Sequence, residues 1–269
     1  MTQTGFIPVP GAEIYYEATG SGYPLILLHA GIADSRMWDA QVAAFASHFR
    51  TIRYDLRGSG KTRLSPGAFS YHEDVAAVVD FLGYERAHVV GISFGGRVAL
   101  DFALAFPQRV SSLVLGAPSV SGETPSERVR RFVEDEEAAL EADDLDHAVE
   151  LNLRLWVDGL QREPHEVSQS VRQLVGTMQR DAFLVDEPNG VTLKPQPPAA
   201  LERLHELQAP VLVIRGALDL PEKNDLAQHL VRRLPDARLV TLPAAHMISL
   251  EEPARFNEEV LNFLHQVDF

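Results

Sequence analysis

Short apolar runs alternate with longer amphipathic runs along most of the chain. The apolar runs are rich in leucine, isoleucine and valine, a composition typical of strands that are buried on both faces of a sheet. The amphipathic runs carry apolar residues every three or four positions, as helices that cover a sheet do. The expected strands span residues 6–9, 14–18, 25–28, 51–54, 87–90, 112–115, 210–215 and 237–242. The expected helices span residues 35–47, 70–82, 97–106, 221–234 and 253–264.

This alternation predicts an α/β fold with a mainly parallel central sheet and helices on both of its faces. The first two strands are expected to form a hairpin that turns at Pro10 and Gly11. Residues 122–203 interrupt the alternation, because this segment is too long for an ordinary connection and is rich in helical periodicity. We therefore predict a helical cap at residues 122–203, inserted between two parts of one core, residues 1–121 and 204–269.

Three helices are expected within the cap, at residues 127–140, 146–157 and 166–179. A stiff, proline-rich stretch at residues 195–198 is expected where the cap returns to the core. In open α/β folds, the loops at the carboxyl ends of the strands gather around the ligand site. The cap is therefore expected to cover that site.

Composition argues against several kinds of site and partner. The chain of 269 residues is 45% hydrophobic, which is enough for a large core. It has no cysteine, so it can form no disulfide, thiolate metal site or thiol nucleophile. The histidines lack the spacing of metal ligands, so we expect neither a metal nor a cofactor. The net charge of −14 argues against nucleic acid as a partner. No signal-peptide pattern and no apolar run near the ~20 residues of a membrane span is seen, so we expect a cytoplasmic protein without membrane contact.

Residues 91–95 carry the strongest chemical signal in the chain. They read Gly-Ile-Ser-Phe-Gly and lie between an expected strand and an expected helix. A sharp strand-to-helix turn exposes the serine oxygen and places the N–H groups of the helix terminus beside it, which turns a poor nucleophile into a useful one. Side chains at Gly91 and Gly95 would collide with neighbouring backbone in so tight a turn. Ser93 is therefore the predicted nucleophile.

A serine nucleophile needs a histidine as base and an acid that orients the histidine. In this architecture the chain order is serine, acid, histidine. His246 is the histidine that opens a loop after a downstream strand, so it is the predicted base. Asp219 lies in the turn after the preceding strand and is the predicted acid. Asp225 is the alternative acid, although it falls inside an expected helix.

Two backbone N–H groups are predicted to form an oxyanion hole, which stabilises the charge that develops on a carbonyl oxygen during acyl transfer. One N–H belongs to Phe94, the residue after the nucleophile. The other belongs to Gly31, in a loop after a buried strand, with Ala30 and Ile32 as alternatives one position away. His29 opens this loop and is expected to shape it rather than to act as an acid or base.

With these residues in view, the chain resembles the α/β-hydrolase family, most of all its serine-type members of esterase, lactonase or perhydrolase character. The resemblance covers nearly the whole chain and is specific for the family, but not for a substrate. Two departures from the family pattern are Ala30 and Ala245, where many members carry glycine, and they narrow the backbone shapes that both loops can adopt. The motifs that carry the resemblance lie at residues 27–31, 54–60, 91–96, 216–219, 245–247 and 250–253.

The resemblance implies a serine hydrolase that cleaves a small carboxylic ester or lactone through an acyl-enzyme. Ser93 would attack the carbonyl carbon, His246 would take and return the proton, and Asp219 would hold the imidazole. The substrate pocket is expected to be lined by aromatic and apolar side chains, namely Phe94, Trp38, Trp156 and Met247.

Two other functions stay open on the sequence alone. A cofactor-free perhydrolase, or haloperoxidase-like enzyme, uses the same three residues with peroxide as the acyl acceptor. A slow-turnover small-molecule receptor of the same fold keeps the three residues and signals through a partner. The acyl group, the alcohol, the stereoselectivity and the oligomeric state have no signature in the sequence.

Overall fold

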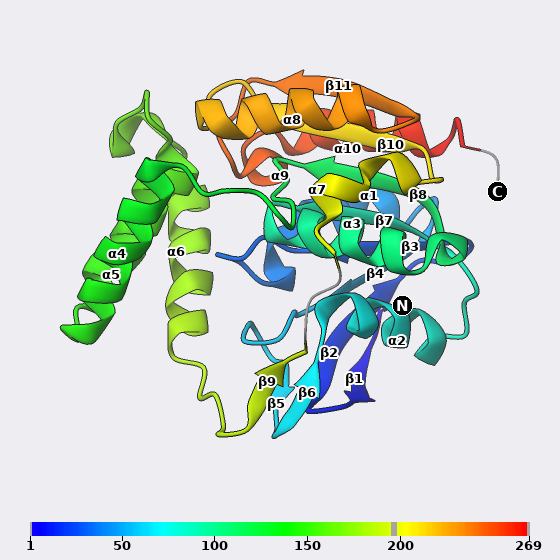
Figure 1. Cartoon of the computed structure of the whole chain (residues 1–269), viewed down its shortest axis with the longest axis horizontal. Coiled ribbons are helices and arrows are strands. Elements are labelled where there is room, and N and C mark those ends of the chain that lie inside the picture. The colour runs from blue at the N-terminus through cyan, green and yellow to red at the C-terminus, as the bar shows by residue number, and fades with distance from the viewer. Residues whose placement is uncertain (1, 195–197, 268–269) are drawn as a thin grey trace.

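The strands form one large sheet and one small sheet (Figure 1). The computed structural model describes residues 2–194 and 198–267. Within these ranges the large sheet has nine strands in the order β1-β2-β4-β3-β7-β8-β10-β11, with β5 paired to β2. They are β1 (Gln3–Val9), β2 (Ala12–Thr19), β3 (Pro24–Leu28), β4 (Arg50–Tyr54), β5 (Arg63–Leu64), β7 (Ala87–Ile92), β8 (Val110–Gly116), β10 (Val211–Gly216) and β11 (Ala237–Leu242). The small sheet pairs β6 (Gly67–Phe69) with β9 (Val191–Leu193).

Most neighbouring strands of the large sheet run parallel. The pairs from β4 through β3, β7, β8 and β10 to β11 are all parallel. The strands β1, β2 and β4 pair antiparallel, and the predicted hairpin turns at Pro10 and Gly11, where Gly11 has a positive φ of 74°. The expected class, a mainly parallel sheet with helices on both faces, is confirmed.

Helices pack on both faces of the large sheet. They are α1 (Asp39–Phe45), α2 (Tyr71–Phe81), α3 (Phe94–Ala105), α8 (Pro221–Arg233) and α10 (Pro253–Leu264). Shorter helical turns are η1 (Ser35–Trp38), η2 (Pro107–Arg109), η4 (Pro164–Glu166), η5 (Leu204–Glu206), α7 (Ala200–Arg203) and α9 (Ile248–Glu251). None of the helices in the described ranges is long and apolar enough to cross a membrane.

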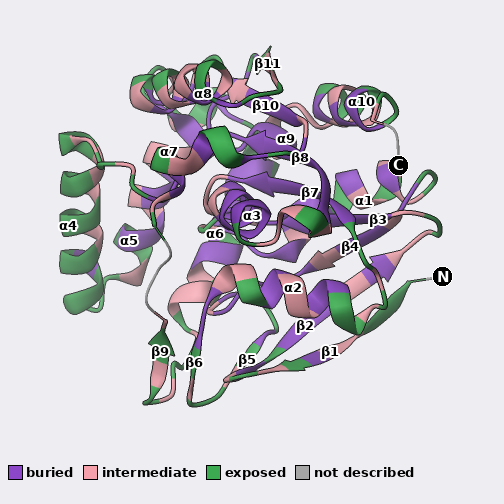
Figure 2. Ribbon diagram, turned by 45° about the vertical axis from the view of Figure 1, so that its right-hand side comes forward, coloured by how far each residue is buried: buried purple, intermediate pink, exposed green. Residues whose placement is uncertain are grey.

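The strand β3 shows how the sequence builds this layered core. Side chains alternate between the two faces of a strand. Ile26 and Leu28 join the cluster that holds the buried residues of α2, α3 and α8, whereas Leu25 and Leu27 join the cluster of α1 and α10. Figure 2 shows the result, with buried residues on the central strands and exposed residues on the outer sides of the helices.

Residues 122–203 leave the core after β8, and the described part of this segment contains four further helical elements besides η4 and α7. These are α4 (Glu127–Glu141), α5 (Leu145–Asn152), the π-helical turn η3 (Leu153–Asp158) and α6 (Gln169–Phe183). Figure 1 shows α4, α5 and α6 together at one side of the sheet. The single helix expected at 146–157 is therefore two elements, since its second half is π-helical. The stiff stretch expected at 195–198 falls largely on residues 195–197, outside the described residues.

Burial of His88 on β7 predicts a pH-dependent loss of stability. Its ring is fully buried, and its Nδ1 lies 2.7 Å from the Ser112 Oγ. Burial, helped by the charge of Arg86, lowers the pKa of His88 from 6.5 to about 4. Between these two values the unfolded chain binds a proton at this site that the folded chain does not. The contribution of His88 to the free energy of unfolding therefore falls as the pH falls from about 6.5 towards about 4.

We expect His88→Asn to remove this contribution. Relative to the variant, the free energy of unfolding of the wild type should fall by up to about 1.4 kcal/mol for each pH unit within that window. Urea unfolding of both proteins at a series of pH values measures it, and the comparison cancels the other titrating groups because both proteins share them. A difference between the two proteins that does not change with pH would contradict the assignment.

Candidate active site

Ser93 stands at a sharp turn between β7 and α3, as the sequence predicts. Its backbone has φ 53° and ψ −115°, a strained conformation for a residue with a side chain and one that clusters at functional sites. The Ser93 N–H donates to the carbonyl of Gly116 at 2.8 Å, which fixes the turn to β8. A Cβ at Gly91 would lie 2.3 Å from the Gly95 carbonyl oxygen, and one at Gly95 would lie 2.2 Å from the Leu28 carbonyl oxygen. Both glycines are therefore required by the close approach of the backbone.

Three loops bring Ser93, His246 and Asp219 together. The His246 Nε2 lies 2.8 Å from the Ser93 Oγ, and the His246 Nδ1 lies 2.8 Å from the Asp219 Oδ2. Asp219 follows β10 and His246 follows β11, two neighbouring parallel strands whose carboxyl ends meet at the same edge of the sheet. With its proton on Nδ1, the imidazole donates to Asp219 and accepts from the serine hydroxyl. Asp225, the alternative acid, is exposed on α8.

The other oxygen of the Asp219 carboxylate, Oδ1, is also held. It accepts the N–H of Leu220 at 2.7 Å, so both carboxylate oxygens have donors. Asp219 and His246 are buried, whereas Ser93 is partly exposed. The acid and the imidazole are therefore shielded from water, while the serine oxygen faces a space that a substrate can enter.

An ion pair connects the inserted segment to the loop of His246. The Glu251 carboxylate accepts the N–H of Ala245 at 3.0 Å, and Arg162 Nη1 donates to its other oxygen at 2.6 Å. Arg162 also donates to the carbonyls of Val157 and Asp158, at the end of η3. Burial raises the pKa of Glu251, and the neighbouring Arg162 opposes this rise. The pair thus ties η3 to the backbone immediately before His246.

The two residues expected to form the oxyanion hole, Phe94 and Gly31, line the same cavity as Ser93. Phe94 is the first residue of α3, so its N–H has no acceptor within the helix. Gly31 packs against it, since a Cβ built on Gly31 would lie 3.5 Å from the Phe94 Cβ. Of the two alternatives, Ala30 already donates its N–H to the Met37 Sδ at 3.3 Å, whereas Ile32 lines the same cavity as Gly31. Gly31 therefore stays the predicted second donor, with Ile32 as the alternative.

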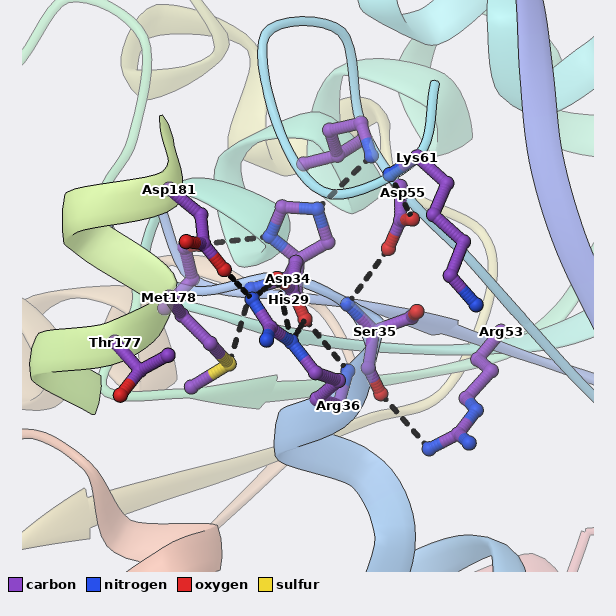
Figure 3. Close-up of polar contacts among 12 residues, drawn as sticks. His29, Asp34, Ser35, Arg36, Arg53, Asp55, Lys61, Thr177, Met178 and Asp181 are labelled. Carbon is purple, nitrogen blue, oxygen red and sulfur yellow. Dashed lines mark hydrogen bonds and ion pairs between the residues drawn. The ribbon is translucent and has the colours of Figure 1, made fainter. Parts of the chain in front are cut away.

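His29 holds the loop that carries Gly31 (Figure 3). Its Nδ1 lies 2.8 Å from the Ala30 carbonyl, and its Nε2 accepts the N–H of Leu56 at 2.9 Å. Burial lowers the pKa of His29, so the ring is neutral with its proton on Nδ1. The Asp55 carboxylate accepts the N–H of Ser35 at 2.9 Å and holds the end of the same loop. His29 therefore shapes the loop, as expected.

The same loop is tied to α6 of the inserted segment (Figure 3). Arg36 donates to the Asp34 carboxylate at 2.6 Å and to the Asp181 carboxylate, on α6, at 2.7 Å. The Asp34 N–H lies 3.5 Å from the Met178 Sδ, also on α6. The loop after β3 and the inserted segment are thus held as one unit beside Ser93.

A cavity of about 300 Å³ opens onto Ser93 and His246. The indole ring of Trp156, on η3, lies 4.6 Å from the His246 ring between centroids and forms part of the wall. A wider groove of about 750 Å³ lies against α4 and η3 and shares Ser126 and Glu222 with the cavity, but Ser93, His246 and Asp219 do not line it. The chemistry therefore belongs to the smaller cavity. Its lining residues are Gly31, Ile32, Ser93, Phe94, Arg97, Ser119, Val120, Glu123, Pro125, Ser126, Val129, Trp156, Glu222, Lys223 and His246.

Comparison with known proteins decides the family. The model of the family described as the alpha/beta hydrolase fold matches residues 23–253. The chain belongs to the α/β-hydrolase family. The resemblance seen in the sequence motifs is thereby confirmed, together with the fold class.

Relatives of this α/β-hydrolase span nearly its whole length. It is 33% identical to the 2-hydroxy-6-oxononadienedioate/2-hydroxy-6-oxononatrienedioate hydrolase of Burkholderia vietnamiensis, over 94% of this chain and 91% of that protein. It is 30% identical to the carboxylesterase YbfK of Bacillus subtilis, over 89% of this chain and 79% of that protein. The crystal structure of a hydrolase from Pseudomonas aeruginosa is similar with a TM-score of 0.79 and 30% identity, and covers 97% of this chain and 98% of that one.

Two residues predicted to line the pocket of this α/β-hydrolase do not do so. Trp38 is fully buried in the cluster of α1 and α10, with its ring 6.2 Å from that of Phe256. Met247 is fully buried in the same cluster. Apolar character predicts burial but not whether a buried side chain borders the cavity, and neither residue is part of the lining. Of the apolar residues expected in the lining, Phe94 and Trp156 do lie in it.

Several polar residues of the cavity wall were missed by sequence analysis. Arg97 follows Ser93 by one helical turn, and the i, i+4 spacing on α3 is a signal that could have identified it. Glu222 and Lys223 lie in the first turn of α8, soon after Asp219. Glu123 gave no signal, because it reaches the site through the path of the inserted segment.

Proposed function

We propose that this α/β-hydrolase is a serine hydrolase that cleaves small carboxylic esters or lactones. The observation that carries the proposal is the hydrogen-bonded series Ser93, His246 and Asp219, with 2.8 Å at both contacts. Two relatives, the carboxylesterase YbfK of Bacillus subtilis and a pimeloyl-[acyl-carrier protein] methyl ester esterase of Nitrosomonas europaea, support the reaction class. The cavity of about 300 Å³ is at the lower end for a small-molecule site and suits a short acyl group.

The proposed reaction begins with attack of the Ser93 Oγ on the carbonyl carbon of the ester. The His246 Nε2 takes the hydroxyl proton and then returns it to the leaving alcohol, while Asp219 stabilises the imidazolium. The negative charge on the carbonyl oxygen is stabilised by the N–H groups of Phe94 and Gly31, and each such donor contributes several kcal/mol, ~3 in measured cases. In a lactone the leaving alcohol stays attached to the acyl group.

Water then hydrolyses the acyl-enzyme with His246 as the base. The oxygen of the water bonds to the acyl carbon, its proton passes to His246, and the Ser93 oxygen leaves with that proton. The products are a carboxylic acid and an alcohol, and the resting enzyme is restored. The proposed cycle uses no metal and no cofactor.

Steady-state hydrolysis of p-nitrophenyl acetate tests this proposal, with a serine-directed phosphonate as the inhibitor control. We expect multiple turnovers that the phosphonate abolishes. A single burst of p-nitrophenol followed by a stall would instead favour the slow-turnover receptor. Peroxide-dependent halogenation in acetate buffer that exceeds the rate of ester hydrolysis would favour the perhydrolase.

We also propose that residues 122–203 act as a cap that selects the substrate. Trp156 and Val129, from this segment, line the cavity, and Trp156 lies against the ring of His246. Arg162 and Arg36 fasten the segment to the loops of the core that carry the site residues. The core would then carry the chemistry and the cap the specificity.

The cap proposal predicts that Trp156→Ala changes selectivity. Removal of the indole enlarges the cavity, so the ratio of kcat/KM for p-nitrophenyl octanoate to that for the acetate should rise roughly tenfold. Glu137→Gln, an exposed change on α4, should leave the ratio unaltered because exposed charges couple weakly to a distant site. Equal loss of activity on both esters in Trp156→Ala would mean that the indole only supports the fold.

A further inference from the structure

Four charged side chains line the cavity, and three of them are neutralised by close partners. The Lys223 Nζ lies 2.8 Å from the Glu123 Oε1 and 3.2 Å from the Ser119 Oγ. Glu222 accepts the hydroxyl of Ser126 at 2.5 Å. Arg128 lies 3.4 Å from the second Glu222 oxygen. Lys223 and Glu123 therefore offset each other, and both oxygens of the Glu222 carboxylate already have a neighbouring donor.

Arg97, the fourth, has a weaker partner. Its Nε lies 3.7 Å from the Asp101 Oδ2, beyond the usual length of a hydrogen bond. Asp101 is also engaged by the Ser121 hydroxyl, which donates to its Oδ1 at 2.7 Å. About a third of the Arg97 side chain, 35%, is exposed. The guanidinium therefore keeps donors available to a ligand in the cavity.

The position of Arg97 places this charge close to the nucleophile. Its N–H donates to the Ser93 carbonyl at 3.1 Å, and the two residues line the same cavity. A second cavity beside Arg97, of about 80 Å³, has room for only a few water molecules.

We propose that Arg97 binds a carboxylate of the substrate, so that the preferred substrates are short esters or lactones with a second, ionised carboxyl group. The planar guanidinium matches the two oxygens of a carboxylate. The amino terminus of α3 adds a favourable dipole for negative charge. Because Arg97 and Ser93 line one cavity of only about 300 Å³, we expect few carbon atoms between the carboxylate and the ester carbonyl. This inference rests on the proposed function and names the substrate class of the same site.

A matched pair of esters tests the inference. Monoethyl glutarate carries a carboxylate, and ethyl hexanoate has an ethyl group in its place. We expect the wild type to hydrolyse the glutarate with the higher kcat/KM. Arg97→Gln should lower kcat/KM for the glutarate roughly ten- to a hundredfold more than for the hexanoate. Loss of a hydrogen bond between two charged groups weakens binding by a factor of this size. Arg97→Lys should restore part of the preference for the glutarate over the hexanoate. Lysine keeps the positive charge but lacks the planar guanidinium that can bind both oxygens of a carboxylate.

The control variant is Arg63→Gln, an exposed arginine on β5 that pairs with Glu13. This substitution removes the same positive charge from the protein. It should leave kcat/KM for both esters at the wild-type values. Wild-type hydrolysis of the hexanoate without an advantage for the glutarate would overturn the inference and leave the proposed function standing. Equal loss on both esters in Arg97→Gln would also overturn it. Failure of the wild type to hydrolyse any ester would overturn the proposed function and this inference with it.

Discussion

Ser93→Ala is expected to abolish turnover and leave the fold intact. Removal of the nucleophile of a serine hydrolase costs on the order of 10⁶ in kcat, because the remaining groups have no oxygen to activate. The strained turn should persist without the hydroxyl, since it is set by Gly91, Gly95 and the bond from the Ser93 N–H to Gly116. Ester hydrolysis measures the loss, and circular dichroism with the unfolding temperature checks the fold.

A second serine of the cavity serves as the control for this prediction. Ser119 lines the same cavity, but its hydroxyl contacts the Lys223 ammonium and not an imidazole. Ser119→Ala should therefore reduce the rate far less than Ser93→Ala does. More than a few per cent of wild-type activity in a well-folded Ser93→Ala protein would show that another group is the nucleophile.

Asp219→Asn is expected to lower kcat by up to ~10⁴. The carboxylate accepts from the His246 Nδ1, whereas an amide NH₂ there would turn the proton to the other nitrogen, so that Nε2 could no longer accept from Ser93. Asp225→Asn, the matched control, should have little effect because Asp225 is exposed on α8. Steady-state rates of both variants on one ester measure the effect. A large loss in Asp225→Asn with full activity in Asp219→Asn would reverse the assignment of the acid.

The sequence predicted those features that local rules determine. The helix at Pro253–Leu264 and the strand at Ala237–Leu242 have the bounds expected from the sequence, because the helix carries one clear apolar face and the strand is a short run rich in apolar residues. The turn at Ser93 was predictable because Gly91 and Gly95 stand between an expected strand and an expected helix, which is the context of a tight strand-to-helix turn. The positions of Asp219 and His246 followed because both come directly after strands of a parallel sheet, whose carboxyl ends share an edge.

Features that depend on contacts between distant segments were not predictable. The small sheet joins Gly67–Phe69 to Val191–Leu193, two short runs whose pairing depends on the path of the inserted segment. Trp38 and Met247 are apolar, as pocket residues often are, yet both are fully buried in the cluster that contains residues of α1 and α10. The weak ion pair between Arg97 and Asp101 was likewise not predictable, because no sequence pattern determines the distance between the two side chains.

The central claim, a covalent acyl-enzyme on Ser93, can be tested by mass spectrometry of the acid-quenched protein. The wild type is mixed with excess p-nitrophenyl acetate, quenched within the first turnovers and digested. The account predicts an added acetyl mass on the peptide that contains Ser93, absent from Ser93→Ala and removed when the substrate is exhausted. Steady turnover of the ester with no adduct on that peptide, or with the acetyl group on another residue, would contradict the account.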